Sequence, residues 1–405
     1  MNLNDPRGII ELGSSTIKCI IFQSKSDNSS EILSTAIADS EGLHNGVLVN
    51  LAKATSSIRS CISNAETQSG TSIKKINVIL EEPEFLCTKF SKHRKIDGSK
   101  IQKDDIEFLL KEAKKQVVLN DNKQSIIHIF NHNYIVDGKT FIEEPIDVYA
   151  NYLSHEMTFI TMPKNNMKNI NQAFIDCDIE IERYISSTFA LSVKLLSKNE
   201  FQFGSTLIDI GYEKTSIGLF KNFALVHSAT FPIGINHIAK DISKVCSLDI
   251  EESKHILSKI DFSFTNLNEI FDEKNNLRNI FFKKSTFRKI SKSLIINIVK
   301  SRLDEMLEII KKQIVISESD PNFKTNTFLV GGGSTLFNLE EYFSNFLSLN
   351  FKKISQKFET KLDQNFNSCL GALKIITCGW ETEAIPEPAN KYKERTGILA
   401  RIFGN

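Results

Sequence analysis

The sequence predicts an α/β protein whose two lobes face each other across a cleft. Glycine-containing turns follow apolar strands at three places, ELGSST (11–16), DIGYEKT (209–215) and VGGGST (330–335). The order strand, turn, strand, strand over residues 8–39 recurs over residues 205–234, which indicates an internal duplication of design. A chain of 405 residues is also longer than one hydrophobic core usually organises. These observations favour two related lobes over a single-core domain.

Hydrophobic periodicity predicts the remaining elements, since helices bury every third or fourth residue and strands every second. Expected helices cover 51–67, 250–260, 291–316 and 367–377. A further helix is expected within 99–116, after an N-cap at Asp104. Expected strands cover 75–82, 155–163 and the end of 167–186. A hairpin is expected over 125–141, with its turn at Asp137-Gly138, and 325–347 combines a strand, a glycine turn and a helix. The block between the two duplicated patterns is large enough for a subdomain of its own.

Bulk properties narrow the class of protein. The 50 basic and 49 acidic residues balance, so no general attraction to nucleic acid is expected. No stretch reaches the roughly 18 apolar residues of a spanning helix, and the N-terminus MNLNDPRG lacks an apolar signal core. Seven scattered cysteines without a CxxC pair predict reduced thiols of the cytoplasm rather than zinc or disulfides.

The three glycine turns predict a nucleotide site. Facing hairpin turns present backbone N–H groups to phosphates, and carboxylates at the two strand ends can hold the water shell of Mg²⁺. A glycine in the third turn lets backbone lie against adenosine. Any one such turn is also explained as an ordinary tight turn, so the hypothesis depends on all three. The candidate residues are Glu11, Gly13, Ser14, Ser15, Thr16, Asp209, Gly211, Lys214, Thr215, Gly331, Gly332, Gly333 and Ser334, with Glu11 and Asp209 holding the metal through water.

This order of turns resembles the phosphate-1, phosphate-2 and adenosine motifs of the superfamily of actin, sugar kinases and heat-shock chaperone ATPases. Within it, the chain resembles the FtsA family of bacterial cell division proteins over nearly its whole length. The segments that carry the resemblance are 41–66, 129–161, 229–243, 300–310 and the short amphipathic C-terminus.

The resemblance implies an actin-like two-lobed ATPase fold with an FtsA-type inserted subdomain, called 1C, and a C-terminal amphipathic helix. The implied division is 1–83 with 167–202 and 366–380 as subdomain 1A, 84–166 as 1C, 203–241 with 300–365 as 2A, 242–299 as 2B, 381–392 as a linker and 393–405 as the membrane-targeting helix.

The resemblance also implies partners. Members of this family bind the C-terminal tail of FtsZ, self-assemble, contact other division proteins and anchor the Z ring as peripheral proteins on the cytoplasmic side of the inner membrane. The implied residues for the FtsZ tail are Lys300 and Arg302. A basic run nearby is either an exposed face or a dock for an acidic peptide; its members are Lys283, Lys284, Arg288 and Lys289.

The second turn departs from the family pattern Asp-Ile-Gly-Gly-Gly-Thr, because Tyr212 and Glu213 replace glycines and Lys214 follows them. Glu213 would repel a triphosphate, whereas Lys214 offers a compensating charge. In the first turn Thr16 stands where the family often has lysine, and Lys254 and Leu257 stand at the usual Glu and Lys positions for the ribose. No residue is evident that would orient an attacking water, so we expect weak binding of ATP with Mg²⁺ and little hydrolysis.

The C-terminal segment predicts a weak membrane anchor. As a helix, 393–405 places apolar side chains on one side at i,i+4 spacing, with basic residues near the other. Burial of four apolar side chains offers at most about 6–12 kcal/mol, and ordering about ten residues costs a comparable amount. A polymer with many tails would therefore bind through avidity. The alternatives are a frayed or docked tail. The proposed membrane-binding residues are Ile398, Leu399, Arg401, Ile402 and Phe403.

Two other interpretations stay open. A PilM-type pilus assembly protein would share the inserted subdomain, bind a short peptide of a membrane protein and not need the amphipathic terminus. A sugar kinase would need a catalytic aspartate near the cleft, for which we find no compelling candidate. His128 and His132 fall on an expected strand, where the i,i+4 spacing does not make a helical metal pair.

Overall fold

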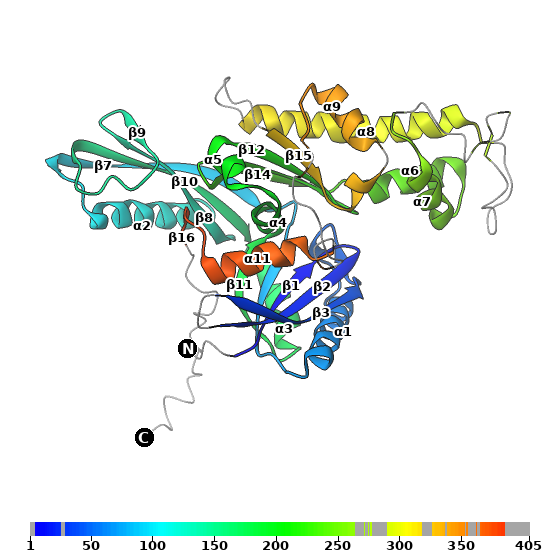
Figure 1. Ribbon diagram of the computed structural model, residues 1–405, viewed down its shortest axis with the longest axis horizontal. Coiled ribbons are helices and arrows are strands. Elements are labelled where there is room, and N and C mark those ends of the chain that lie inside the picture. The colour runs from blue at the N-terminus through cyan, green and yellow to red at the C-terminus, as the bar shows by residue number, and fades with distance from the viewer. Residues whose placement is uncertain are drawn as a thin grey trace.

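The computed structural model describes residues 5–25, 29–263, 271, 274, 276–277, 290–317 and 326–384, without 337, 353, 355–361 and 363–364. Figure 1 shows two lobes packed together, each around a sheet of its own, and an elongated inserted subdomain that extends from one end. The predicted two-lobed α/β architecture is confirmed.

The first lobe contains β1 (Arg7–Leu12), β2 (Thr16–Ser24), β3 (Ser30–Asp39), β4 (Leu43–His44), β5 (Val47–Leu48), α1 (Leu51–Ser69), β6 (Lys75–Leu80), α3 (Lys164–Ile175), β11 (Glu180–Ser186), α4 (Ser187–Leu195) and α11 (Asn367–Cys378). Its main sheet has the order β11-β6-β1-β2-β3. β1 pairs antiparallel with β2 and parallel with β6. The apolar runs of β1 and β2 are buried along most of their length, which fixes the first glycine turn at the end of a rigid hairpin.

The second lobe contains α5 (Lys198–Phe203), β12 (Ser205–Ile210), β13 (Thr215–Lys221), β14 (Ala224–Phe231), α6 (Ile235–Cys246), α7 (Ile250–Lys259), α8 (Lys292–Ser317), β15 (Asn326–Val330), the short 3₁₀ helix η1 (Gly332–Thr335) and α9 (Leu339–Leu347). Its sheet order is β14-β13-β12-β15. The β12–β13 hairpin repeats the design of β1–β2, because Glu11 faces Lys18 in one and Asp209 faces Ser216 in the other. The predicted duplication is thus present in the fold.

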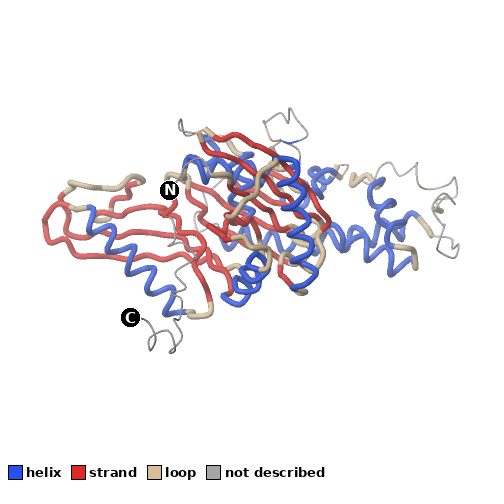
Figure 2. Tube along the Cα trace, turned by 90° about the horizontal axis from the view of Figure 1, so that it is seen from below, coloured by secondary structure: helices blue, strands red, loops and turns tan. Residues whose placement is uncertain are grey.

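The inserted subdomain contains β7 (Leu86–Lys100), α2 (Lys103–Asn120), β8 (Gln124–Val136), β9 (Lys139–Phe141) and β10 (Tyr149–Pro163). β10 lies between β7 and β8 and is antiparallel to both. Figure 2 shows α2 running along this sheet. The predicted Asp137-Gly138 hairpin turn is confirmed, with φ of 46° and 82° at the two residues, as a type I′ turn requires.

The predicted N-cap of α2 is wrong. The helix begins at Lys103, and Gln102 is its N-cap. The Asp105 carboxylate accepts the Gln102 N–H at 2.8 Å, so this aspartate closes a reciprocal capping box. Asp104 instead lies in the first turn, where its charge favours the helix dipole.

Residues 380–384 form what we call the C-terminal latch. The chain leaves α11 and joins the inserted sheet as β16 (Glu383–Ala384), which pairs antiparallel with β8. The Asn131 N–H donates to the Thr382 carbonyl at 2.8 Å. The expected linker 381–392 therefore begins too early, because Thr382, Glu383 and Ala384 are bonded to the inserted subdomain. Polar composition suggested a linker there, but β pairing and side-chain contacts hold this segment in place.

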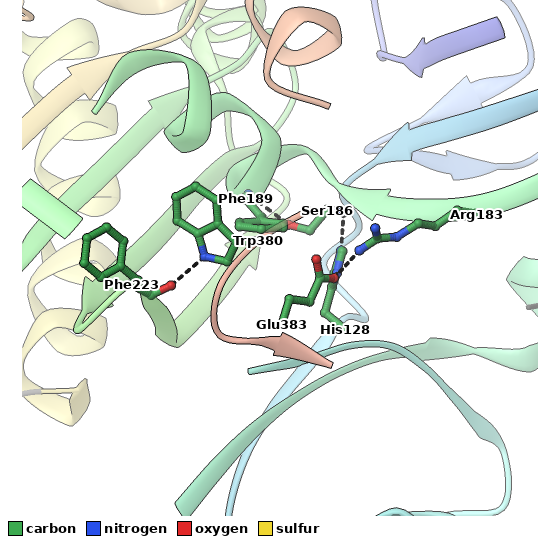
Figure 3. A network of polar contacts seen from close by, with 7 residues as sticks. All are labelled: His128, Arg183, Ser186, Phe189, Phe223, Trp380 and Glu383. Carbon is green, nitrogen blue, oxygen red and sulfur yellow. Dashed lines mark hydrogen bonds and ion pairs between the residues drawn. The ribbon is translucent and has the colours of Figure 1, made fainter. Parts of the chain in front are cut away.

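Glu383 is the buried centre of the latch (Figure 3). Its side chain is 1% exposed and lies 2.5 Å from His128 Nδ1, and the Arg183 guanidinium forms an ion pair with the same oxygen. His128 Nε2 accepts the Ser186 N–H at 2.8 Å, which leaves Nδ1 to donate to Glu383. Burial raises the pKa of the Glu383 carboxyl, but the contacts with His128 and Arg183 outweigh burial and hold that pKa below its usual value.

The latch also reaches the second lobe. Trp380 Nε1 donates to the Phe223 carbonyl at 2.6 Å, and Thr382 Oγ1 donates to the same oxygen at 2.8 Å. The Trp380 ring meets Phe201 edge to face, with centroids 4.8 Å apart. Because Phe223 lies in the turn between β13 and β14, the latch joins the first lobe, the inserted subdomain and the second lobe.

Other predicted segments are not covered. The expected amphipathic helix 393–405, most of the linker and the basic run 283–289 lie outside the described residues. Within the described residues, no helix combines the length and the apolar character needed to cross a bilayer.

His155 is expected to weaken the inserted subdomain in acid. It is fully buried on β10, stacks on Tyr134 with centroids 4.4 Å apart, and neither ring nitrogen has a hydrogen-bond partner. Burial lowers its pKa from 6.5 to about 4. Since the unfolded chain takes up the proton first, stability is lost as pH falls from about 6.5 towards 4.

His155→Phe should therefore raise the free energy of unfolding by about 1–3 kcal/mol, the cost of an unsatisfied buried polar group, with a gain that grows below pH 6.5. Denaturant unfolding at pH 7.5 and pH 5 measures both effects. His93→Phe, at an exposed position of β7, is the control and should show neither. A smaller gain at pH 5 than at pH 7.5 would contradict the argument.

Candidate functional site

The three glycine turns meet where the two lobes approach each other. A Cβ on Gly331 would lie 2.5 Å from the Ile210 carbonyl oxygen, so the second and third turns are in backbone contact. The Gly46 N–H donates to Ser14 Oγ at 3.2 Å, and a Cβ on Gly46 would lie 2.8 Å from Lys214 Nζ. The hairpin β4–β5 thus connects the first turn to the second. This convergence is confirmed, whereas the binding roles of the turn residues stay predictions.

The two predicted metal-binding carboxylates, Glu11 and Asp209, lie close enough for the charge of Glu11 to affect the pKa of Asp209. Glu11 contacts Lys18 Nζ at 3.3 Å and accepts the Ser368 hydroxyl at 3.0 Å. The Glu11 charge raises the pKa of Lys18 despite burial. Asp209 is buried, and burial together with the Glu11 charge raises its pKa to about 6. A cation between them would relieve this repulsion. Lys18 thus supplies a positive charge near the first turn, although Thr16 stands where the family often has lysine.

Two further carboxylates, which the sequence analysis did not single out, follow β6. Glu81 accepts the Ser186 hydroxyl at 2.7 Å and the Thr188 N–H at 3.0 Å. Glu82 accepts Asn166 Nδ2 at 2.7 Å, and burial raises its pKa to about 7. Both are almost completely buried. Their signal in the sequence is an acidic pair directly after an apolar strand, at the carboxyl end of a parallel strand where sites commonly form.

Lys214 crosses from the second turn to the first lobe. Its ammonium donates to the Glu81 carbonyl oxygen. Burial lowers the pKa of Lys214 and outweighs the charges of Glu81, Asp209 and Glu11, which raise it. The partly buried ammonium therefore lies near several carboxylates, whose charges favour its protonated form.

Glu213 crosses the cleft beside it. Its carboxylate accepts the Asn45 N–H at 3.1 Å and contacts His44 Nδ1 at 2.9 Å, both on the first lobe. Lys240 of α6 lies 3.5 Å from its other oxygen. The residue is 8% exposed. Glu213 thus has a set of inter-lobe partners that the sequence did not reveal.

The glycines of the first two turns allow the backbone to turn tightly. A Cβ on Gly13 would lie 2.5 Å from the Thr16 carbonyl oxygen, and one on Gly211 would lie 2.9 Å from that of Lys214. The Ser15 carbonyl accepts the Ser40 N–H at 3.1 Å. These tight turns explain the glycines without reference to a ligand.

The third turn and the end of the second are also held by local contacts. Thr215 donates its hydroxyl to the Ile233 carbonyl at 2.7 Å, and Ser334 donates to the Gly331 carbonyl at 2.7 Å. Gly333 packs on the Ile210 side chain, and a Cβ on Gly332 would meet no atom within 4 Å. Gly332 therefore faces the open space that the adenosine prediction requires.

The residues fit a bound Mg²⁺–nucleotide only in part. Glu11 and Asp209 supply the oxygen ligands that Mg²⁺ prefers, and the third turn offers open backbone. Lys214 and Glu213, however, lie across the phosphate side of the cleft and contact the first lobe. The arrangement therefore does not fit a triphosphate unless these side chains move. In the part of the chain that the structure describes, no group of three or more His, Cys, Asp or Glu residues has metal-site geometry.

The two residues implied for the FtsZ tail differ in their surroundings. Arg302 makes a two-point contact with Asp241 of α6 at 2.6 and 3.0 Å and a further one with Glu305 at 2.5 Å. It thus joins α6 to α8 and is not open for a ligand as it stands. Lys300 lines a groove of about 410 Å³; its other lining residues are Phe262, Ser263, Glu341, Tyr342, Asn345 and Phe346.

Duplicated hairpin sheets, acidic strand ends and three converging glycine turns define a protein of the actin-like ATPase fold. Solved structures agree. A PilM–PilN type IV pilus biogenesis complex matches with a TM-score of 0.61 at 11% identity, covering 92% of this chain and 97% of that one. MreB5 of Spiroplasma citri bound to AMPPNP matches with a TM-score of 0.54 at 12% identity, covering 92% and 96%.

Sequence comparisons narrow the class further. The family model of the SHS2 domain inserted in FtsA matches residues 85–161, and that of cell division protein FtsA matches residues 206–371. The chain is 25% identical to cell division protein FtsA of Borreliella burgdorferi, over 98% of this chain and 96% of that protein. It is 28% identical to that of Bacillus subtilis, over 78% and 70%. The chain belongs to the FtsA family of cell division proteins.

Proposed function

We propose that the chain is a cytoskeletal adaptor of bacterial cell division. It binds the C-terminal tail of FtsZ, self-assembles, contacts other division proteins and anchors the Z ring as a peripheral protein on the cytoplasmic side of the inner membrane. The observation that carries this proposal is the inserted four-stranded subdomain, because the FtsA-specific model matches it over 85–161. A pull-down of the full chain with the FtsZ tail is the direct test, and no retention would sink the proposal.

We place the FtsZ tail in the groove beside Lys300. The groove combines apolar surface from Phe262 and Phe346 with the Lys300 ammonium, which suits a short peptide that carries acidic or carboxylate groups. Arg302 supports the groove indirectly, because its contact with Asp241 holds α6 against α8. Charge reversal at Arg302 would break its contact with Asp241 as well as affect binding. A substitution of Lys300 therefore tests the proposed binding site more directly.

Lys300→Glu is expected to weaken binding of the FtsZ tail by roughly three- to tenfold, because it replaces attraction by repulsion at a rim charge. Fluorescence anisotropy with a labelled tail peptide measures the dissociation constant. Lys311→Glu, at an exposed position of the same helix, is the matched control and should leave it unchanged. If both variants bind the tail peptide with equal affinity, the binding site for the FtsZ tail does not lie in this groove.

We further propose that residues 393–405 attach the protein to anionic lipid. Ile402→Glu combined with Phe403→Glu should release it from vesicles of anionic lipid, because the change removes apolar burial and adds charge of the same sign as the headgroups. Arg401→Ala should do less, about 1 kcal/mol per monomer. Co-sedimentation of the full chain, the double variant and a chain ending at Tyr392 measures the effect. Equal sedimentation of all three would exclude this segment as the anchor.

For the nucleotide we propose weak binding of ATP with Mg²⁺ and at most slow turnover. Glu11, Asp209 and the Gly331–Gly333 turn supply the frame, whereas Glu213 and Lys214 must leave the phosphate side first. An adaptor needs no efficient hydrolysis, so this site does not define an enzyme.

A PilM-type pilus assembly protein is the second candidate, and the fold match to the PilM–PilN complex favours it. The two proposals differ in the peptide they require. Retention on a short peptide of a membrane protein, with no retention on the FtsZ tail, would favour the pilus function.

A further inference from the structure

The second glycine turn carries side chains where the family pattern carries none. In the pattern Asp-Ile-Gly-Gly-Gly-Thr, the place of Glu213 is a glycine and the place of Lys214 is a threonine. Here Glu213 reaches Asn45, 168 positions away in sequence, and Lys214 reaches Glu81, 133 positions away. Neither contact is available to the family's residues, because glycine has no side chain and threonine is too short.

The first lobe is shaped to receive these side chains. Gly46 has a φ of +85°, and a Cβ there would lie 2.1 Å from the Glu81 carbonyl oxygen and 2.8 Å from Lys214 Nζ. The hairpin β4–β5 therefore packs directly over the lysine. His44 and Asn45 of the same hairpin hold the Glu213 carboxylate at 2.9 and 3.1 Å. One short hairpin thus contacts both side chains.

The charge at this place favours a cation. Burial, together with the charges of Glu11 and Glu81, raises the pKa of Asp209, whereas the charge of Lys214 lowers it. The Lys214 ammonium, which is covalently attached and donates to the Glu81 carbonyl oxygen, supplies positive charge where the two lobes meet.

We propose that Glu213 and Lys214 form a strap that holds the two lobes closed without a nucleotide. The inference rests on the proposal that the cleft is the nucleotide site. The strapped form excludes a triphosphate, so the apparent affinity falls in proportion to the fraction of molecules in which the strap is open. The closed form is then the resting form of the protein rather than a consequence of nucleotide binding.

The first test removes the strap by restoring the family's residues, Glu213→Gly with Lys214→Thr, in the full chain. Glu143→Gly with Lys139→Thr, at exposed positions of β9 and of the segment that follows it, is the matched control. Small-angle scattering without nucleotide should show an expanded strapless variant and a control identical to wild type. With Mg²⁺, a fluorescent ATP analogue should bind the strapless variant on the order of tenfold more tightly than wild type. Scattering of the strapless variant that matches wild type without nucleotide would overturn the strap.

The second test uses Lys214→Met, which keeps the length of the side chain and removes the ammonium that donates to the Glu81 carbonyl oxygen. Small-angle scattering without nucleotide should show this variant expanded relative to wild type, by less than the double variant, because Glu213 still contacts Asn45 and His44. Scattering identical to that of wild type would overturn the role of Lys214 in the strap. Scattering does not depend on the FtsZ tail, so failure of the adaptor function would be seen separately in the pull-down.

Discussion

Gly371→Ala is expected to destabilise the protein, although alanine is the better helix former. Gly371 lies where α11 crosses α4, and a Cβ there would lie 1.8 Å from the Ala190 carbonyl oxygen and 2.7 Å from its carbonyl carbon. The obstacle is backbone, so no side chain can rotate away and the helices must separate. Overpacking usually costs about 1–3 kcal/mol, and a clash with backbone belongs at or above the upper end of that range. This cost exceeds the ~1 kcal/mol by which the higher helix propensity of alanine would stabilise the helix.

Denaturant unfolding followed by near-UV circular dichroism measures this effect. Gly332→Ala is the control, because the same methyl group meets no atom within 4 Å there and should leave the midpoint unchanged. Separation of α11 also moves Ser368 away from Glu11, which it contacts at 3.0 Å, so the cleft should change with the core. A midpoint for Gly371→Ala at or above that of wild type would mean that the two helices do not approach so closely.

Glu383→Ala is expected to be the most damaging change in the C-terminal latch. It removes the carboxylate between His128 and Arg183 and leaves a partly buried guanidinium without its anion. Breaking a buried ion pair by removal of one partner costs about 3–5 kcal/mol. Glu383→Gln keeps the shape and a hydrogen-bond acceptor, so its cost should be smaller.

Hydrogen exchange distinguishes loss of the latch from general loss of stability. The Asn131 N–H donates to the Thr382 carbonyl and should lose protection in Glu383→Ala, whereas amides of β12 and β13 should keep theirs. Glu381→Ala, two positions earlier at an exposed place, is the control. Unchanged protection of Asn131 in Glu383→Ala would show that β16 pairs with β8 without the help of this carboxylate.

The elements that sequence predicted well are those with local causes. The three glycine turns follow from short-range geometry, and the duplicated hairpins follow from buried apolar runs that contain their own turns. The Asp137-Gly138 hairpin is of the same kind. The predicted N-cap of α2 is wrong, because Gln102 and Asp104 are both polar and only the contact with Asp105 decides between them.

The parts that sequence did not reveal depend on distant pairs. Ser368 reaches Glu11 across 357 positions, and Glu383 reaches His128 across 255. No periodicity records such partners, so the sequence predicts only an ordinary strand histidine for His128 and a linker for the latch. The sequence also predicts that Glu213 repels a ligand, because it does not reveal the Asn45 N–H that the carboxylate accepts.

The latch has a mechanical consequence. A force on the chain beyond Ala384 is borne first by Glu383 and Thr382, and these residues divide it among anchors in three parts of the molecule: His128 on β8, Arg183 on β11 and Phe223 between β13 and β14. Tension at this end is thus carried into the inserted subdomain and both lobes at once, and no single joint has to withstand the whole load.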